Sequence, residues 1–225
     1  FAITPETGAR LRKRITAGEK LRLHAEVDVE IGKGAMPVIT ARVPGRGEQE
    51  ILLTGHIDEP GANDNASGPA MALEIGRVLL ELNKGRKTPA LRRGLRFLFS
   101  VEVRGVQAVM NERPVFVCPG VAGIDLDMVG ADPNEVRSVL SVTPNQPGLA
   151  DFGYPLMRKC VQPLEDYGRG YKTVEGHFDT NDNGMGEPLV GVPTVVVMMC
   201  PDLVYHTSLD KPEICSARAI TRLGA

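Results

Sequence analysis

Two short stretches between residues 55 and 68 hold residue types that bind zinc. His56 and Asp58 lie two positions apart, and Asp64 follows in a glycine-rich loop at residues 61–68. Imidazole nitrogens and carboxylate oxygens are zinc ligands, and a catalytic zinc takes about three protein ligands together with a water molecule. The spacing also allows the Asp58 carboxylate to orient the His56 ring. These residues predict a metal site.

The composition of the loop agrees with this prediction but also fits a simpler one. Its glycines let the backbone turn sharply beside Asp64. Ser67 is placed to cap the helix expected after the loop, whose positive end would then face the site. The alternative is that Asn63, Asp64 and Asn65 only form a turn, because such residues are common in turns.

Predicted strands and helices alternate along the chain and would position these residues. Apolar runs predict buried strands over residues 51–55, 95–101, 124–129 and 194–199. Apolar residues at helical spacing predict helices over residues 71–82 and 105–111. This alternation predicts an α/β fold, a three-layer α/β/α sandwich with a mostly parallel sheet.

Residues 21–31 have a different pattern, in which apolar and polar residues alternate. Such alternation predicts a half-exposed strand near a sheet edge. Residues 38–43 are its expected partner across a turn at residues 32–34. An antiparallel pair of this kind would make the sheet mixed.

Polar residues come at or just after the carboxyl ends of the predicted parallel strands. Ligands of open α/β sheets bind at that edge. Residues far apart in the sequence should therefore meet there. They are His56, Asp58, Glu102, Asp127 and His206.

The length and the net charge of the chain limit the classes of protein to which it can belong. The 225 residues carry a formal net charge of −2, which argues against nucleic acid or an anionic membrane as a partner. No apolar run approaches the roughly 18 residues of a membrane span. The length suits one catalytic domain over residues 1–225. Because the chain begins with Phe1, we expect a part of a longer protein and assign no compartment.

Six motifs occur in the order found in family 28 metallopeptidases, which the chain resembles. That family contains zinc aminopeptidases and is related to glutaminyl cyclases. The motifs are His56-Ile57-Asp58, residues 61–68, residues 102–105, residues 125–128, Asp182-Asn183 ahead of residues 191–193, and Tyr205-His206-Thr207. Together they span residues 51–210, and Pro201-Asp202 resembles an aminopeptidase-like subgroup.

The resemblance implies a role for each matching residue. Glu102 would be the general base and Asp58 would orient His56. Asp64 would be shared between two ions. The implied metal ligands are His56, Asp64, Asp127 and His206.

Substrate contacts are expected from three further residues, Asp182, Tyr205 and His177. For His177, which lies in a glycine-containing loop, a solvent-exposed surface position is the alternative.

The chain departs from the family pattern at Val103, where the family has a second glutamate that binds the second ion. Valine cannot bind a metal, so we expect one tightly bound zinc and leave the second site open. Either Glu102 becomes a ligand, or one ion binds well, or activity is weakened. Asn183 stands where many relatives have histidine.

The motifs predict a zinc-dependent aminopeptidase that hydrolyses the N-terminal peptide bond of a peptide substrate. One alternative is an acyl transferase of the glutaminyl-cyclase type. Another is a catalytically weakened module that binds a metal or a peptide. The fold does not separate these three functions.

Overall fold

The computed structural model describes residues 3–85, 88–111, 119–146, 148–149, 151–177 and 182–225. Its contacts divide the chain into two units, Phe1–Ala35 and Met36–Ala225. The first unit contains helix α1 (Pro5–Thr16), where the Thr4 side chain caps the helix by accepting a hydrogen bond from the Thr7 amide. The sheet and the residues of the candidate site belong to the second unit.

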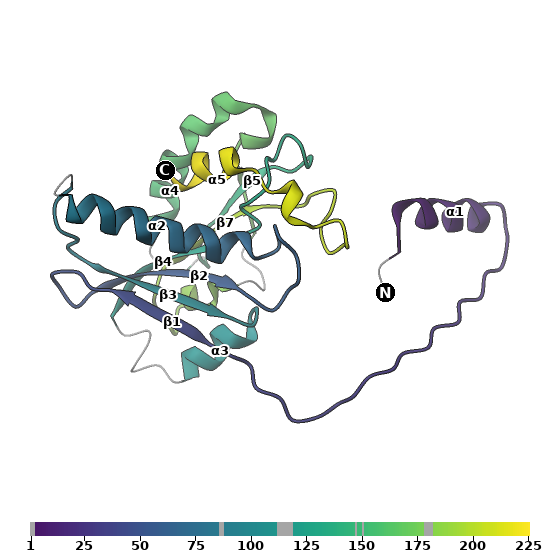
Figure 1. The fold of residues 1–225 in the computed structure, drawn as a ribbon, viewed down its shortest axis with the longest axis horizontal. Coiled ribbons are helices and arrows are strands. Elements are labelled where there is room, and N and C mark those ends of the chain that lie inside the picture. The colour runs from purple at the N-terminus through teal and green to yellow at the C-terminus, as the bar shows by residue number, and fades with distance from the viewer. Residues whose placement is uncertain (1–2, 86–87, 112–118, 147, 150, 178–181) are drawn as a thin grey trace. The chain divides into compact units, whose positions relative to one another are not determined.

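The described part of the second unit contains a seven-stranded sheet in the order β1-β3-β2-β4-β7-β5-β6 (Figure 1). Strands β3, β2, β4 and β7 are parallel, whereas β1 and β5 run antiparallel to β3 and β7. The predicted mixed and mostly parallel sheet is therefore confirmed. The bounds are β1 Ile39–Val43, β2 Glu50–His56, β3 Gly94–Ser100, β4 Gly120–Asp127, β5 Leu140–Thr143, β6 Val174–Glu175 and β7 Thr194–Met199.

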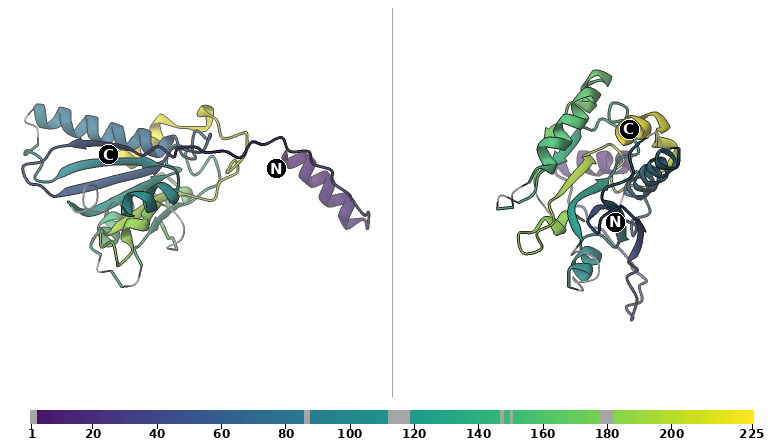
Figure 2. Two further views of the ribbon diagram at one scale, coloured as in Figure 1. Left: turned by 90° about the horizontal axis from the view of Figure 1, so that it is seen from below. Right: turned by 90° about the vertical axis from the view of Figure 1, so that its left-hand side faces the viewer.

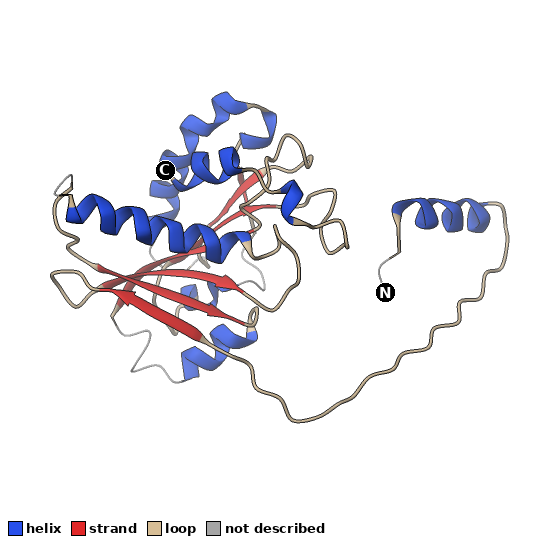
Figure 3. Ribbon diagram, in the orientation of Figure 1, coloured by secondary structure: helices blue, strands red, loops and turns tan. Residues whose placement is uncertain are grey.

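Helices flank the strands of this sheet (Figure 3). The two predicted helices correspond to α2 (Ser67–Lys84) and α3 (Arg104–Asn111). The described part of the second unit also contains α4 Gly153–Val161, α5 Ala217–Gly224, η1 Gln162–Tyr167, η2 Arg169–Tyr171, η3 Asp182–Gly186 and η4 Pro212–Ile214. None of the described helices is both long and apolar enough to cross a lipid bilayer.

Successive side chains of a strand point to opposite faces of the sheet, so each central strand contributes to two apolar layers. Leu53 of β2 packs in the layer that contains Met71 of α2. Its neighbour Leu52 packs in the layer that contains Val106 of α3 and Met185 of η3. Helices α2 and α3 consequently lie on opposite faces of the sheet (Figure 2). This is the expected three-layer α/β/α sandwich.

The predicted hairpin of residues 21–31 and 38–43 is wrong. Residues 19–38, all of which the structure describes, form no helix or strand. Leu23 is 84% exposed and Ile31 is 95% exposed. Strand β1 instead pairs with β3, with Ile39 opposite Phe99. Alternation shows which face of a strand can be buried, but a strand forms only where another strand takes up its backbone hydrogen bonds.

Glu50, at the amino end of β2, is a fully buried carboxylate. It accepts hydrogen bonds from Arg96 at 2.5 Å from Nε and 3.2 Å from Nη2, and it forms an ion pair with Arg42. Arg42 and Arg96 are register partners on β1 and β3. The ion triad therefore ties the first three strands of the sheet together at the end opposite to His56.

Replacing Glu50 with alanine should lower the free energy of unfolding by about 3 kcal/mol, because a buried ion pair that loses one partner leaves the other charge uncompensated. Urea denaturation followed by circular dichroism measures this change. Glu48→Ala is the matched control: Glu48 is exposed in the preceding loop, and its loss should change stability by less than about 0.5 kcal/mol. Equal effects of the two variants would show that the triad does not stabilise the sheet.

Candidate metal centre

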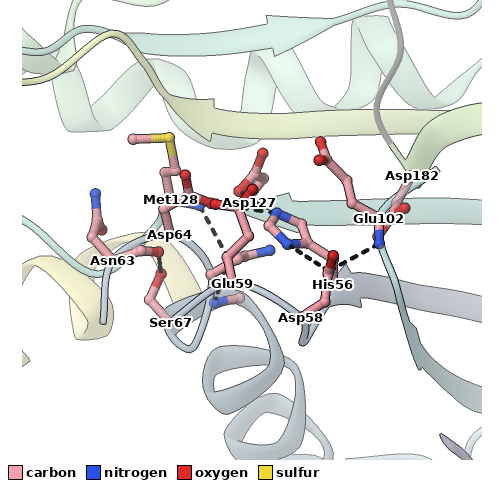
Figure 4. Close-up of polar contacts among 12 residues, drawn as sticks. His56, Asp58, Glu59, Asn63, Asp64, Ser67, Glu102, Asp127, Met128 and Asp182 are labelled. Atoms are coloured by element: carbon pink, nitrogen blue, oxygen red, sulfur yellow. Dashed lines mark hydrogen bonds and ion pairs between the residues drawn. The ribbon is translucent and has the colours of Figure 1, made fainter. Parts of the chain in front are cut away.

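The carboxyl ends of the parallel strands bring the predicted ligands together. His56 is the last residue of β2 and Asp127 is the last residue of β4. The strand register places His56 beside Ser100 of β3, two residues before Glu102. Because parallel strands end at the same edge of a sheet, side chains from separate parts of the sequence meet there (Figure 4).

His56, Asp64 and Asp127 form one group of possible metal ligands. Nε2 of His56 lies 3.4 Å from Oδ1 of Asp64 and 3.4 Å from Oδ1 of Asp127. Zinc bonds to nitrogen and oxygen of about 2.0–2.2 Å in a tetrahedron place neighbouring ligand atoms roughly 3.3–3.5 Å apart. The three side chains are also buried. Both the donor types and their spacing therefore fit zinc.

A second group consists of Glu59, Asp64 and His206. Nε2 of His206 lies 3.2 Å from Oδ2 of Asp64 and 3.2 Å from Oε2 of Glu59. The two oxygens of Asp64 thus face two different histidines. Glu59 was not predicted, although it is a carboxylate three positions after His56 in the same strand-end loop.

The backbone of the loop at residues 61–68 is held by Asp210, another residue that was not predicted. The Asp210 carboxylate accepts hydrogen bonds from the amides of Asn63 at 2.7 Å and Asp64 at 2.9 Å. A side chain at Gly61 would place its Cβ 2.3 Å from the Asp210 carboxylate, which is one reason for glycine there. The only feature of the sequence that pointed to Asp210 is its position four residues after His206.

Asn65 and Ser67 connect the loop to helix α2 and to strand β4, but Ser67 does not cap the helix as predicted. The helix begins at Ser67, and Asn65 Oδ1 accepts the hydrogen bond from the Gly68 amide at 3.1 Å. The Ser67 hydroxyl donates to the Asn63 carbonyl at 2.7 Å and accepts from the Val129 amide at 2.9 Å. With these two hydrogen bonds, the Ser67 side chain stabilises the loop and does not cap the helix.

Two aspartates hold the turn that carries Glu102. Oδ1 of Asp58 accepts a hydrogen bond from the Glu102 amide at 3.0 Å and lies 3.5 Å from Nδ1 of His56. Oδ1 of Asp182 accepts from the Val103 amide at 2.8 Å. Asp182 is 0% exposed, and its expected contact with substrate stays a prediction. Its carboxylate lies below the surface and supports the turn.

A pocket of about 360 Å³ opens beside these groups. Tyr205, a predicted substrate contact, lines it and stacks on His206 with ring centroids 3.8 Å apart. His177 is exposed in the loop after β6 and is not among the described residues that line this pocket. The lining residues are Glu59, Asp64, Glu102, Val103, Asp127, Met128, Met198, Cys200, Tyr205 and His206.

The crowded charges shift the pKa values of the site. Burial opposes a charge on His56, but the hydrogen bond and the charge of Asp127 raise the pKa of His56 to about 10. Burial, followed by the charges of Asp127 and Glu59, raises the pKa of Asp64 to about 8. Burial also raises the pKa of Glu102. A proton on His56 and one on Asp64 thus occupy atoms that a metal ion would bind.

Three residues that line the pocket have a left-handed backbone conformation, which side chains other than glycine rarely adopt. They are Val103 at φ 55°, Met128 at φ 51° and His206 at φ 53°. Valine is the least favourable of the three because its side chain is β-branched. Strained residues of this kind are often found at functional sites, where the surrounding structure holds them.

Solved structures with the same fold include enzymes. The glutaminyl cyclase of Porphyromonas gingivalis is 20% identical, with a TM-score of 0.63 over 84% of this chain and 74% of that protein. A leucine aminopeptidase precursor of Bacteroides thetaiotaomicron is 19% identical, with a TM-score of 0.61 over 83% of this chain and 73% of that protein. A Zn-dependent exopeptidase of Parabacteroides distasonis is 19% identical, with a TM-score of 0.62 over 84% and 75%.

The chain spans only 42% of the length of another structure that it matches. No curated protein matches the chain. The sequence model of Peptidase family M28, by contrast, matches residues 38–225, which include the whole sheet and every residue of the candidate centre. The chain therefore belongs to peptidase family M28.

Proposed function

We propose that this chain is a zinc-dependent aminopeptidase that hydrolyses the N-terminal peptide bond of peptides. The observation that carries the proposal is the spacing of His56, Asp64 and Asp127, whose donor atoms lie as the ligands of one zinc ion would. Glu102 lines the same pocket. The similarity in fold to a leucine aminopeptidase precursor and to a Zn-dependent exopeptidase supports the proposal.

Zinc is the proposed ion because the donors are one imidazole and two carboxylates, a set that suits it. When bound, zinc polarises the carbonyl of the scissile bond and lowers the pKa of water. Asp58 lies 3.5 Å from Nδ1 of His56 and would keep Nε2 of that ring directed at the ion.

Glu102 is the proposed general base, which takes a proton from the attacking water and returns it to the leaving amine. Its backbone is held by the hydrogen bond from its amide to Asp58. Burial raises the pKa of Glu102, which brings the carboxylate closer to the range where it can both accept and release a proton near neutral pH.

The pocket suits the amino end of a peptide. Burial and the charge of Asp64 raise the pKa of Tyr205 to about 12, so its hydroxyl stays protonated and can donate a hydrogen bond to the substrate. A volume of about 360 Å³ is at the small end of ligand pockets and fits a short terminal segment.

A second candidate is acyl transfer of the glutaminyl-cyclase type, which the similarity in fold to the Porphyromonas gingivalis enzyme favours. Parallel assays separate the candidates. Release of arylamine from a leucyl-arylamide supports the aminopeptidase, whereas release of ammonia from a glutaminyl peptide supports the cyclase. Zinc binding without either reaction would indicate a metal- or peptide-binding module.

Replacing Glu102 with glutamine should preserve the side-chain shape but remove the base. Turnover of a leucyl-arylamide should fall by a factor of about 10²–10⁴. Zinc content and melting temperature should stay close to those of the parent protein. Loss of zinc in this variant would identify Glu102 as a ligand, and retained turnover would contradict its role as the base.

Zinc affinity should increase as the pH rises between about 6 and 9, because metal ligands must lose their protons before they bind. The pKa of His56 is about 10 and that of Asp64 is about 8 in the metal-free protein, so both groups hold protons at neutral pH. Calorimetry in buffers with different ionisation enthalpies should detect more than one proton released for each zinc at about pH 7. Binding that does not depend on pH would rule out these two residues as ligands.

Replacing Asp210 with alanine should loosen the loop that carries Asp64, since two backbone amides lose their acceptor. Zinc affinity should fall by a factor of about 10–100, as for other residues that support metal ligands. Competition with a fluorescent zinc chelator measures this change. Glu213→Ala is the control, because Glu213 is an exposed acid only three residues away. If both variants bind zinc as the parent does, Asp210 does not hold the loop.

A further inference from the structure

We propose that Glu59 is a metal ligand and that, with Asp64 and His206, it forms a second divalent-cation site in this chain. The inference rests on the proposed function, because Asp64 would bind the first ion as well. It extends the prediction of one ion, which counted only the positions that match the family motif.

The second site needs a carboxylate that does not come from the usual turn. Val103 occupies the position where the family has its second glutamate, and it lines the pocket. Its side chain has no atom that can bind a metal. Its backbone amide is held by Asp182 at 2.8 Å. The turn after β3 therefore keeps its place at the pocket, although this residue cannot bind a cation.

Glu59 approaches the same part of the pocket from the loop after β2. Its Oε2 lies 3.2 Å from Nε2 of His206, and only 25% of its side chain is exposed. The next residue is Pro60, which restricts the backbone of the preceding residue to extended conformations. The proline thus reduces the conformational freedom that Glu59 would lose when it binds an ion.

Asp64 is oriented to connect the two sites. Its Oδ1 lies 3.4 Å from Nε2 of His56, and its Oδ2 lies 3.2 Å from Nε2 of His206. One carboxylate with its oxygens directed at two separate histidines has the arrangement of a bridging ligand. The separations at the second group are also near the roughly 3.3–3.5 Å expected between neighbouring zinc ligands.

The balance of charge favours two ions. Four carboxylates line the pocket, from Glu59, Asp64, Glu102 and Asp127, and the two histidines next to them are neutral when they bind a metal. One divalent ion would leave two net negative charges in a partly buried site. A second ion would neutralise them, and no lysine or arginine is among the described lining residues to do so.

The test is the number of zinc ions bound, measured by equilibrium dialysis of the full chain against zinc followed by elemental analysis. The parent protein should bind two ions. Glu59→Gln should bind one, with affinity for the second ion weakened by a factor of about 100 or more. Glu48→Gln, which changes an exposed glutamate at the other end of β2, should still bind two. Melting curves establish that each variant is folded.

A double variant provides an independent check. Adding Val103→Glu to Glu59→Gln restores a carboxylate at the usual turn and should return the count towards two. Two ions in Glu59→Gln, or one ion in the parent protein, would overturn the inference and leave the first zinc site intact. Loss of both ions in a folded Glu59→Gln would also overturn it, since Glu59 would then support the first site. Absence of zinc from the parent protein would instead reject the proposed function itself.

Discussion

Repulsion between carboxylates is the constraint on which the site depends. Asp64, Asp127, Glu59 and Glu102 line one pocket, where like charges interact more strongly than they do in water. The fold opposes this repulsion with histidine nitrogens and with backbone amides, which fix the loops that carry the acids. The raised pKa of Asp64 is a direct result of this crowding and of burial. A cation would relieve the same repulsion, which is why a metal centre is the natural interpretation.

The two ends of strand β2 carry different clusters of charged residues. At the amino end of β2, Glu50 is fully paired with arginines from the two neighbouring positions of β1 and β3. At the carboxyl end, His56 faces Asp64 and Asp127, and nearby residues such as Val103 have a left-handed backbone conformation. The seven residues of β2 thus connect the ion triad of Glu50 to the candidate metal centre.

A metal ion responds to the positions of donor atoms and not to the order of residues in the chain. Val103 removes a donor from the turn after β3, while Glu59 places one beside His206 from the turn after β2. Both turns lie at the same edge of the sheet, so a ligand can come from either.

The amino-acid sequence by itself determined the central strands, helices α2 and α3 and the grouping of His56 with the distant Asp127. Local periodicity and strand ends are properties of short segments, so they can be predicted from the residue types of those segments. Only the tertiary structure decided that residues 21–31 form no strand, that Asp182 is buried, and that Glu59 and Asp210 reach the site. Each of these depends on which distant segment supplies the partner, because hydrogen bonds and ion pairs between loops leave no periodic pattern in the sequence.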